Sequence, residues 1–354
     1  MNRLFPPELA GGPFWTGELD YQLPAGRIAQ HPAARREASR LMVVDRERDT
    51  IEHSRFASIA SFLPPRALLV ANDSRVIPAR LRGRKQESGG AVEVLLLAMD
   101  GGCVARAMVR VAKTLRRDQR LLFGGGVTAR VASAPQQGRV LLDFAPLSVV
   151  EVLDRCGELP LPPYIERPGG PTEEDRERYQ TVYADHPGSV AAPTAGLHFT
   201  REILDSLAAG GFELANITLH VGPGTFTPVR GDAAAHQMEA ERFEIAAGAA
   251  GRIAAAKRDG CAVVAVGTTT VRALESAATS GGVASGAQST RLFIRPGHRF
   301  RVVDALITNF HLPGSTLLAL VMALAGRERI RSAYETAARE GYRFYSYGDA
   351  MLIR

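Results

Sequence analysis

Short apolar runs fill the chain from Leu68 to Phe144. Glycine-rich turns, among them Gly89-Gly90 and Gly124-Gly125-Gly126, separate several of these runs. Short strands at regular spacing with turn signals between them indicate a small antiparallel β-barrel. The runs are Ala67 to Ala71, Val92 to Met99, Val104 to Val111, Arg120 to Phe123, Val127 to Val131 and Val140 to Phe144.

From about Tyr179 onward, strand-like and helix-like patterns alternate. The expected strands are Glu213 to Leu219, Ala262 to Val266 and Val302 to Ile307. The expected helices are Ala246 to Asp259, Thr269 to Thr279 and Thr316 to Gly341, the last with a break at Gly326. This alternation predicts an α/β sandwich with a covered, largely parallel sheet.

A further strand-like piece, Leu41 to Asp45, precedes the barrel region. We therefore predict that the barrel is inserted into the α/β domain. Residues 1–65 and 157–354 are expected to form the α/β catalytic domain, and residues 66–156 the barrel. A chain of 354 residues with 45% hydrophobic and 23% charged residues suits two globular domains.

The cysteines and the apolar runs exclude several classes of protein. Cys103, Cys156 and Cys261 form no C-x-x-C pair, so neither a zinc ribbon nor a redox motif is supported, and no metal is implied. The N-terminus lacks the apolar core of a signal peptide. The longest apolar run near the C-terminus, Thr316 to Ala325, is about half of a membrane span. We therefore expect a cytoplasmic protein without a membrane partner.

Basic residues concentrate in one segment. The net charge is +6, but the segment from Arg75 to Arg120 alone carries +7 and the remainder −1. Such a segment suits a phosphate-rich partner, although an ordinary solvated face is as plausible from charge alone. The candidate nucleic-acid contacts are Arg80, Arg82, Arg84, Lys85, Lys113, Arg116 and Arg117.

Two polar, small-residue segments lie where ligands commonly bind. The run from Ala191 to Phe199 contains Thr194, Gly196 and His198 and precedes a helical pattern that starts near Thr200. Small residues and a helix N-terminus let a ligand approach the backbone, but a plain N-cap loop is the simpler reading. The run from Leu219 to Phe226 follows a predicted strand; it supplies Gly222, Gly224 and His220, a plausible proton carrier.

The third segment runs from Gly267 to Arg272. A glycine followed by Thr268, Thr269 and Thr270 at a strand-to-helix junction makes a small anion cradle, with Arg272 in the first turn of the helix. An N-capped helix whose arginine pairs with a nearby acid explains the pattern equally well.

Two further segments carry polar groups beside apolar ones. In the run from Thr308 to Pro313, Asn309 and His311 follow an apolar strand, and an asparagine can donate and accept at one ligand edge. The run from Tyr342 to Asp349 has four aromatic rings, which suit base stacking or, more simply, a terminal edge strand. The chain has no phosphate loop, zinc-protease helix, serine elbow or calcium loop.

Taken together, these segments resemble one family, the S-adenosylmethionine:tRNA ribosyltransferase-isomerases of the queuosine pathway. The resemblance runs in order from Asp20 to Arg354. Besides the five segments it includes Asp20-Tyr21, Ile28-Ala29-Gln30, Ala38-Ser39-Arg40-Leu41, Asn72-Asp73-Ser74-Arg75, Leu161-Pro162-Pro163-Tyr164-Ile165 and Arg178-Tyr179-Gln180-Thr181-Val182-Tyr183.

The chain departs from the family pattern at four positions. Glu239 stands where the family usually has a second histidine after methionine, Pro223 replaces a usual alanine, and Gly314 replaces a usual lysine. Ser74 replaces a usual threonine. The change at Glu239 puts in doubt an essential histidine there, and we expect Glu239 to order its loop.

The resemblance implies an α/β domain with an inserted β-barrel and an unusual reaction. S-adenosylmethionine would donate its ribosyl part to 7-aminomethyl-7-deazaguanine at the wobble position of a tRNA, giving epoxyqueuosine and releasing adenine and methionine. The implied partners are this tRNA and S-adenosylmethionine as co-substrate, with no further cofactor; a monomer is expected.

The implied reaction needs at least one base and one acid. The sulfonium acidifies the adjacent 5′-carbon, adenine leaves more easily when protonated, and the acceptor amine must be neutral. The candidates are His220, His198, His311 and Asp349, unranked except that we expect His220 to transfer protons. For the donor we expect contacts from Thr194, Gly196, Gly222, Gly224, Gly267, Thr268, Thr269, Arg272 and Asn309, with the methionine carboxylate at Gly267 to Arg272.

Two other functions fit parts of the sequence. An S-adenosylmethionine-dependent tRNA methyltransferase is disfavoured because no glycine-rich dinucleotide-like loop follows an N-terminal strand. A catalytically silent tRNA-binding homologue is disfavoured by the intact histidine and glycine-threonine segments, although Glu239 keeps it open.

Overall fold

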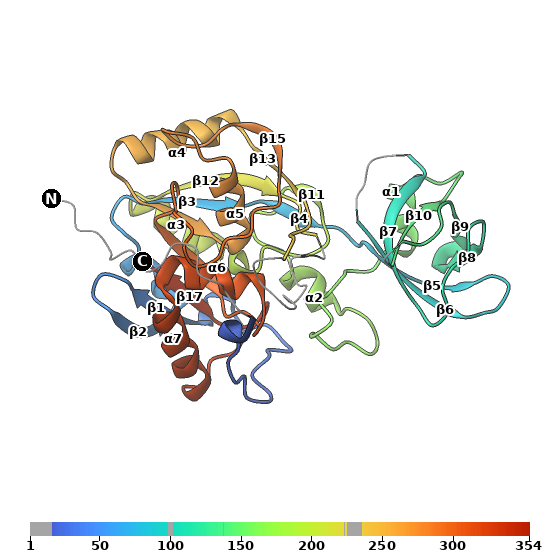
Figure 1. Ribbon diagram of the computed structural model, residues 1–354, viewed down its shortest axis with the longest axis horizontal. Coiled ribbons are helices and arrows are strands. Elements are labelled where there is room, and N and C mark those ends of the chain that lie inside the picture. Colours follow the sequence, from blue (N-terminus) through green and yellow to red (C-terminus); the bar gives the residue numbers. More distant parts are fainter. Residues whose placement is uncertain (1–15, 98–101, 137, 223, 225–235) are drawn as a thin grey trace. The chain divides into compact units, whose positions relative to one another are not determined.

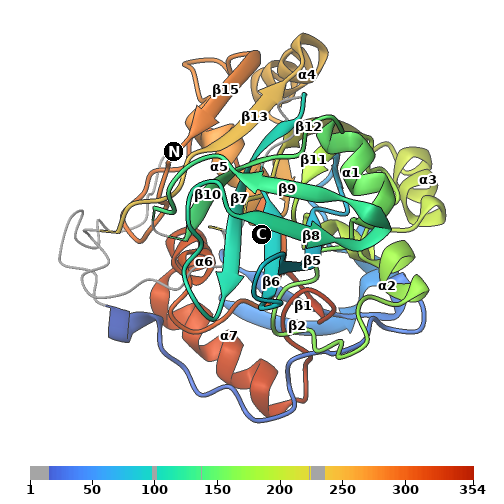
Figure 2. The same cartoon turned by 90° about the vertical axis from the view of Figure 1, so that its right-hand side faces the viewer.

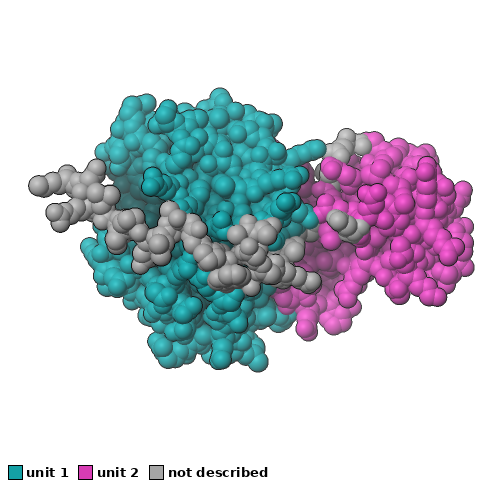
Figure 3. Space-filling view, viewed as in Figure 1, with its two compact units in different colours: residues 1–74, 181–185, 193–354 teal, residues 75–180, 186–192 magenta. Residues whose placement is uncertain are grey.

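The computed structural model describes residues 16–97, 102–136, 138–222, 224 and 236–354. The chain folds into two compact units, coloured separately in Figure 3. Unit 1 comprises Met1–Ser74, Thr181–Asp185 and Pro193–Arg354. Unit 2 comprises Arg75–Gln180 and His186–Ala192, so the chain passes from unit 1 to unit 2 and back twice.

A nine-stranded sheet forms the centre of unit 1 (Figure 1). Its middle strands β12, β3, β14 and β16 are parallel to one another. In sheet order the strands are β15 (Gly286–Thr290), β13 (Glu241–Ile245), β12 (Glu213–Leu219), β3 (Leu68–Asn72), β14 (Val263–Val266), β16 (Ala305–Asn309), β17 (Ala350–Ile353), β1 (Arg40–Asp45) and β2 (Thr50–Arg55).

The sheet is mixed rather than largely parallel as predicted. β13 pairs antiparallel with β12 and β15, and β17 pairs antiparallel with β16. β1 and β2 are also antiparallel, because the short turn that joins them cannot make the long crossover that a parallel pair needs. The sequence pattern predicted the central strands but not how the outer strands run.

Helices cover both faces of this sheet, so the α/β sandwich is confirmed. On one face, strand residues such as Leu69, Val264 and Ile307 pack against Phe199 and Ile203. Helices α4 and α5 lie against β12, β3 and β14. The helices of unit 1 are α3 (Arg201–Ala209), α4 (Ala247–Arg258), α5 (Thr268–Ser276), α6 (Thr316–Ala325) and α7 (Arg327–Arg339), with 3-10 turns η1 (Thr16–Leu19), η2 (Arg36–Ala38), η3 (Phe56–Ser61) and η5 (Thr194–His198).

The predicted helix break at Gly326 is confirmed. Gly326 separates α6 from α7 and has a φ of 91°, which a residue with a Cβ rarely adopts. Within the described part of the chain, no helix has both the length and the apolar character that crossing a bilayer requires.

Unit 2 contains the predicted closed antiparallel barrel, whose strands are labelled in Figure 2. Gly83 is needed inside it, since a Cβ there would lie 2.5 Å from the Phe123 ring. Helix α1 (Val149–Cys156) adds Val149, Val152 and Leu153 to the barrel core. The barrel strands are β5 (Arg80–Lys85), β6 (Ala91–Leu96), β7 (Val104–Val111), β8 (Arg120–Phe123), β9 (Thr128–Val131) and β10 (Arg139–Asp143).

One expected barrel strand lies elsewhere. The apolar run at residues 67–71 is β3, which belongs to the nine-stranded sheet. All five residues of β3 are buried, as is typical of a central parallel strand, and its apolar pattern resembles that of a barrel strand of equal length. The remaining elements are η4 (Gly124–Gly126), α2 (Glu173–Arg178) and the pair β4 (Ser74–Val76) and β11 (His186–Ser189).

Candidate active site

The segments predicted to carry chemistry meet at one edge of the nine-stranded sheet. The parallel strands β12, β3, β14 and β16 all end there. The antiparallel strands β13 and β17 begin there. The carboxyl ends of parallel strands are where open α/β sheets bind ligands. The residues brought to this edge are His220 after β12, Asp73 after β3, Gly267 after β14, Phe310 and His311 after β16, Glu241 at the start of β13 and Asp349 before β17.

The turn η5 joins this edge. The Nε2 atom of His198 lies 3.2 Å from the Nδ2 atom of Asn309, at the end of β16. A Cβ on Gly267 would lie 3.7 Å from the Cβ of Ala195. The structure therefore brings together the first, third and fourth predicted segments, which lie far apart in the sequence.

His198 has both ring nitrogens committed to neighbours. Asn309 donates to Nε2, so Nδ1 carries the proton and donates to Ser39 Oγ at 3.0 Å. Burial, with the nearby Arg343 and Arg36 cations, lowers the pKa of His198 to about 3. The imidazole is therefore neutral and suits positioning Asn309 better than carrying protons.

The two polar atoms of the Asn309 side chain differ in what they contact. Its Nδ2 atom donates to His198 and to the Tyr345 carbonyl at 3.1 Å. Its Oδ1 atom is buried and has no hydrogen-bond partner among the described residues. Since buried polar atoms are nearly always paired, this oxygen is a candidate contact for a ligand N–H.

His311 is also buried and neutral. Its Nε2 atom lies 2.8 Å from Thr308 Oγ1, and burial lowers its pKa to about 3. Its backbone is fixed on both sides: Tyr334 Oη accepts from its N–H at 3.0 Å, and Tyr21 Oη donates to its carbonyl at 2.5 Å. These contacts give His311 a structural role.

Asp349 holds the backbone of the aromatic segment. Its Oδ1 atom accepts from the Arg40 N–H at 2.9 Å, and its Oδ2 atom accepts from the Arg343 N–H at 2.8 Å. The carboxylate is 2% exposed, so both oxygens are occupied within the fold. This geometry argues against Asp349 as the base. The segment is also no edge strand, because it precedes β17 without forming a strand, and β17 itself lies between β16 and β1.

His220 differs from these three groups. It is half-buried and directly follows β12, and its N–H donates to the Arg242 carbonyl at 3.1 Å. The chain beyond it reaches Gly222, where an added Cβ would meet nothing within 4 Å. The residues Pro223 and Thr225 to Phe226 of this segment lie outside the described residues.

The other glycines of the site serve different needs. Gly196 packs against Tyr183, since a Cβ would lie 2.1 Å from Tyr183 Oη. Gly224 packs against Glu239, whose Cδ atom would lie 2.8 Å from such a Cβ. Tight packing within the fold therefore explains Gly196, where the sequence suggested close approach of a ligand. Glu239 is exposed and lies beside Gly224.

The third segment begins helix α5. Gly267 precedes it with a φ of 92°, and no side chain caps the helix N-terminus. Thr268 and Thr269 are each 6% exposed in its first turn, and Thr194 is half-buried in η5. Arg272 is buried and forms an ion pair with Glu241, which agrees with the pairing, but not with the capping, in the alternative interpretation of this segment.

Three residues of this edge were not among the sequence candidates. Asp73 is buried and accepts from Thr218 Oγ1 at 2.7 Å. Tyr183 is buried with no hydrogen-bond partner for its Oη among the described residues; burial and the nearby Asp73 raise its pKa. Glu241 is the third. The motifs around Asn72-Asp73 and Tyr183 were visible in the sequence, but nothing in it marked Glu241.

The basic residues of unit 2 do not form one uniform surface. Along β5, Arg82 and Arg84 are exposed, whereas Lys85 is buried and donates to the Lys113 carbonyl at 2.6 Å. Side chains alternate along a strand, so the inward position of Lys85 follows from its place next to Arg84. The predicted contact of Lys85 with nucleic acid requires an exposed ammonium group, whereas this one is buried inside unit 2. Lys113, Arg116 and Arg117 are exposed.

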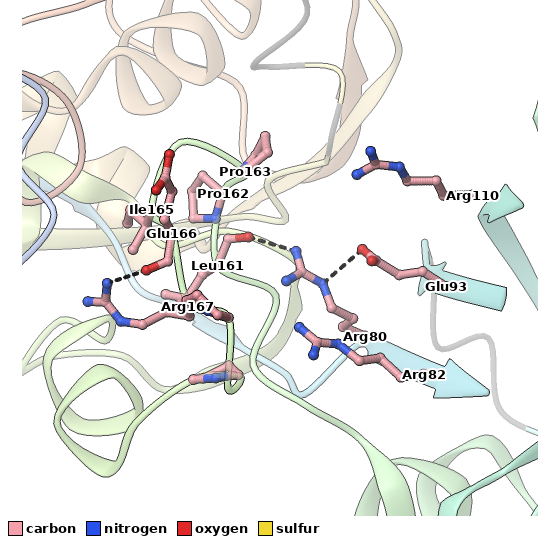
Figure 4. Close-up of a pocket in the computed structure, with 12 residues that line it drawn as sticks. Arg80, Arg82, Glu93, Arg110, Leu161, Pro162, Pro163, Ile165, Glu166 and Arg167 are labelled. Carbon is pink, nitrogen blue, oxygen red and sulfur yellow. Dashed lines mark hydrogen bonds and ion pairs between the residues drawn. The ribbon is translucent and has the colours of Figure 1, made fainter. Parts of the chain in front are cut away.

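A pocket of about 360 Å³ lies in unit 2 between barrel residues and the loop that begins at Leu161 (Figure 4). Arg80 closes one side, donating to the Leu161 carbonyl at 2.7 Å and lying 3.4 Å from Glu93. Arg82 pairs with Glu158 at 3.3 Å. Arg110 is exposed and, like Arg82, lies opposite Glu93 in the barrel register, so Glu93 has arginine neighbours on both adjacent strands. These contacts give Arg80, a candidate nucleic-acid contact in the sequence, a structural role.

Comparison with known proteins identifies the family. A family model described as "Queuosine biosynthesis protein" matches residues 16–353. The chain belongs to this family. It is 53% identical over 342 residues to an S-adenosylmethionine:tRNA ribosyltransferase-isomerase of Anaeromyxobacter sp. (strain Fw109-5), covering 95% of this chain and 98% of the relative. A protein of the same name from Citrifermentans bemidjiense is 50% identical over 344 residues, covering 96% of this chain and 99% of the relative.

A solved structure is also similar. The S-adenosylmethionine tRNA ribosyltransferase of Thermotoga maritima is 34% identical, with a TM-score of 0.55. The match covers 95% of this chain and all of that one. The family membership predicted from the sequence motifs is therefore confirmed over nearly the whole chain.

Proposed function

We propose that this protein is an S-adenosylmethionine:tRNA ribosyltransferase-isomerase. It transfers and isomerises the ribosyl part of S-adenosylmethionine onto 7-aminomethyl-7-deazaguanine at the tRNA wobble position, with release of adenine and methionine. The observation that carries this proposal is the 53% identity, over nearly the full length, to a relative that bears this name. As a tRNA-modifying enzyme, it would act in the cytoplasm.

The donor occupies the sheet edge in this proposal. Several polar atoms there are buried and have no hydrogen-bond partner in the part of the chain that the structure describes, namely Asn309 Oδ1, Tyr183 Oη and two nitrogens of Arg272. Native proteins leave few such atoms unpaired, so their concentration at the carboxyl ends of parallel strands favours a ligand. Thr194, Gly222, Gly267, Thr268 and Thr269 complete the donor site.

Proton transfer falls to His220 in this proposal. His198, His311 and Asp349 have their polar atoms engaged within the fold. His220 is half-buried beside the proposed donor site, where an imidazole can exchange protons with a bound ligand. The first proton to be removed lies on the 5′-carbon beside the sulfonium.

The tRNA contacts unit 2 in this proposal. Exposed arginines and Lys113 neutralise phosphates, and the pocket with Arg82 and Arg110 at its rim offers a concave place for one nucleotide. The guanidinium groups can bind phosphate oxygens in pairs.

The experiment is to incubate the full chain with S-adenosylmethionine and tRNA that carries the 7-aminomethyl-7-deazaguanine precursor. Adenine and methionine, in equal amounts with modified tRNA, are expected. S-adenosylhomocysteine among the products would show a methyltransferase instead. Binding of tRNA without any small product would show a silent homologue.

A further inference from the structure

A buried ion pair lies at the sheet edge, between helix α5 and strand β13. Arg272, the fifth residue of α5, is 2% exposed, and Glu241, the first residue of β13, is 5% exposed. The two side chains are in direct contact. Burying two charges costs more than their attraction returns unless further hydrogen bonds complete the pair, so such a pair is weak evidence for a stabilising role.

Arg272 has more donors than Glu241 can use. Its Nε and Nη1 atoms are buried and have no hydrogen-bond partner among the described residues. Burial lowers the pKa of Arg272 only to about 10, so the guanidinium stays charged at neutral pH. Buried N–H groups of a charged side chain are nearly always hydrogen-bonded, so these two nitrogens indicate that a bound ligand supplies the acceptor.

The surroundings of Arg272 also favour a carboxylate. Helix α5 has nine residues and an N-terminus that no side chain caps, so its first N–H groups and its dipole favour negative charge. Thr268 and Thr269 add hydroxyl groups to the same turn. Glu241 reaches this place from β13, whose next residue, Arg242, accepts the hydrogen bond from the N–H of His220.

We propose that the Arg272–Glu241 pair recognises the zwitterionic end of the donor's methionine part, which makes the pair a specificity determinant. Arg272 and the α5 N-terminus bind the α-carboxylate, and Glu241 accepts from the α-ammonium. A pair without net charge matches a zwitterion without net charge. An analogue of S-adenosylmethionine without the carboxylate places an ammonium group beside the Arg272 guanidinium. It also leaves the Nε and Nη1 atoms of Arg272 without a hydrogen-bond acceptor. This inference rests on the proposed function.

The first test uses the unaltered protein and three ligands. Calorimetry would compare S-adenosylmethionine, decarboxylated S-adenosylmethionine and 5′-methylthioadenosine, which lacks both charged groups. Hydrogen bonds to charged groups are worth roughly 10- to 100-fold in Kd. We expect decarboxylated S-adenosylmethionine to bind weaker than the parent by about this factor. Equal Kd values for the two sulfonium ligands would overturn the inference and leave the proposed function intact. No binding of S-adenosylmethionine would overturn both.

The second test removes the pair without leaving a lone buried charge. The double variant Arg272→Gln with Glu241→Gln keeps the site neutral and similar in size. We expect it to lose the preference for S-adenosylmethionine over the decarboxylated form, with unchanged tRNA affinity. The matched control is Arg258→Gln with Asp259→Asn. It removes an exposed ion pair whose Arg258 Nε and Asp259 Oδ1 atoms lie 3.6 Å apart. A double variant that keeps the full preference would contradict the assignment, and loss of its fold, seen as a lost Tm, would show that the pair is structural.

Discussion

At the scale of single residues, hydrogen bonds within the fold separate the candidate proton carriers. His198 bridges Ser39 and Asn309, and Asp349 accepts from two backbone N–H groups. A group that must give up two buried hydrogen bonds to transfer a proton is a poor general base. His220, which is half-buried and directly follows β12, is the candidate that we favour.

Replacing His220 by alanine tests that ranking. Removal of a general acid or base typically lowers the rate by about 10²- to 10⁴-fold, and we expect kcat to fall within this range with tRNA affinity unchanged. His31→Ala is the control, because this histidine is exposed in unit 1. Retention of most of the turnover in His220→Ala would return the search to Tyr183 and Asp73.

The buried histidines predict how stability depends on pH. His198 and His311 have pKa values lowered to about 3, so the unfolded chain binds more protons than the folded one between about pH 3 and about pH 6.5. Stability therefore falls as the pH drops through this window. At about pH 5 each of the two histidines is expected to lower the free energy of unfolding by about 2 kcal/mol relative to neutral pH.

Urea unfolding at several pH values checks this expectation. His198→Gln removes one titrating group and should flatten the fall in the free energy of unfolding, whereas His31→Gln should not. An unchanged pH dependence in His198→Gln would contradict the account of a neutral, buried imidazole.

At the scale of elements, η5 holds the site by packing as much as by hydrogen bonds. Gly196 lies against Tyr183, and a Cβ there would also lie 2.7 Å from Thr181 Cγ2. Gly196→Ala should therefore destabilise the protein by about 1–3 kcal/mol. Adding Tyr183→Phe should recover part of this loss, since it removes the closest atom.

Thermal unfolding would measure these changes. Gly248→Ala is the matched control, because an added Cβ in this α4 position meets nothing within 4 Å and should stabilise the helix by about 0.5–1 kcal/mol. A Gly196→Ala variant as stable as the parent would show that η5 moves to accept the Cβ.

The sequence predicted elements well where local pattern determines them. Helices α4 to α7 and the break at Gly326 followed from periodicity and a glycine that allows positive φ. β3 was assigned to the wrong sheet, because an apolar run of five residues does not say which strands it pairs with. The pairings of Arg272 with Glu241 and of His198 with Asn309 depend on tertiary contacts between distant segments, which no spacing in one sequence reveals.

At the scale of the whole molecule, positive charge and the proposed donor site lie in different units. Exposed Arg84, Arg116 and Arg117 of unit 2 are expected to contact tRNA phosphates. Replacing all three by alanine should raise the KM for tRNA more than that for S-adenosylmethionine. It should also reduce the slope of log K for tRNA binding against log salt concentration by roughly 0.7–0.9 per lost phosphate contact.

Three exposed arginines on helices of unit 1 provide the control, namely Arg201, Arg258 and Arg331. The control variant has the same net charge as the test variant. If both sets weaken tRNA binding equally, charge in general rather than the unit 2 surface would explain the affinity.

The central claim is that this protein transfers the ribosyl part of S-adenosylmethionine rather than its methyl group. The most direct measurement follows isotope-labelled donor into tRNA, with the label either in the ribose ring or in the methyl carbon. The account predicts that ribose label enters the tRNA while methyl label leaves with methionine. Methyl label in the tRNA, with ribose label left in S-adenosylhomocysteine, would contradict it.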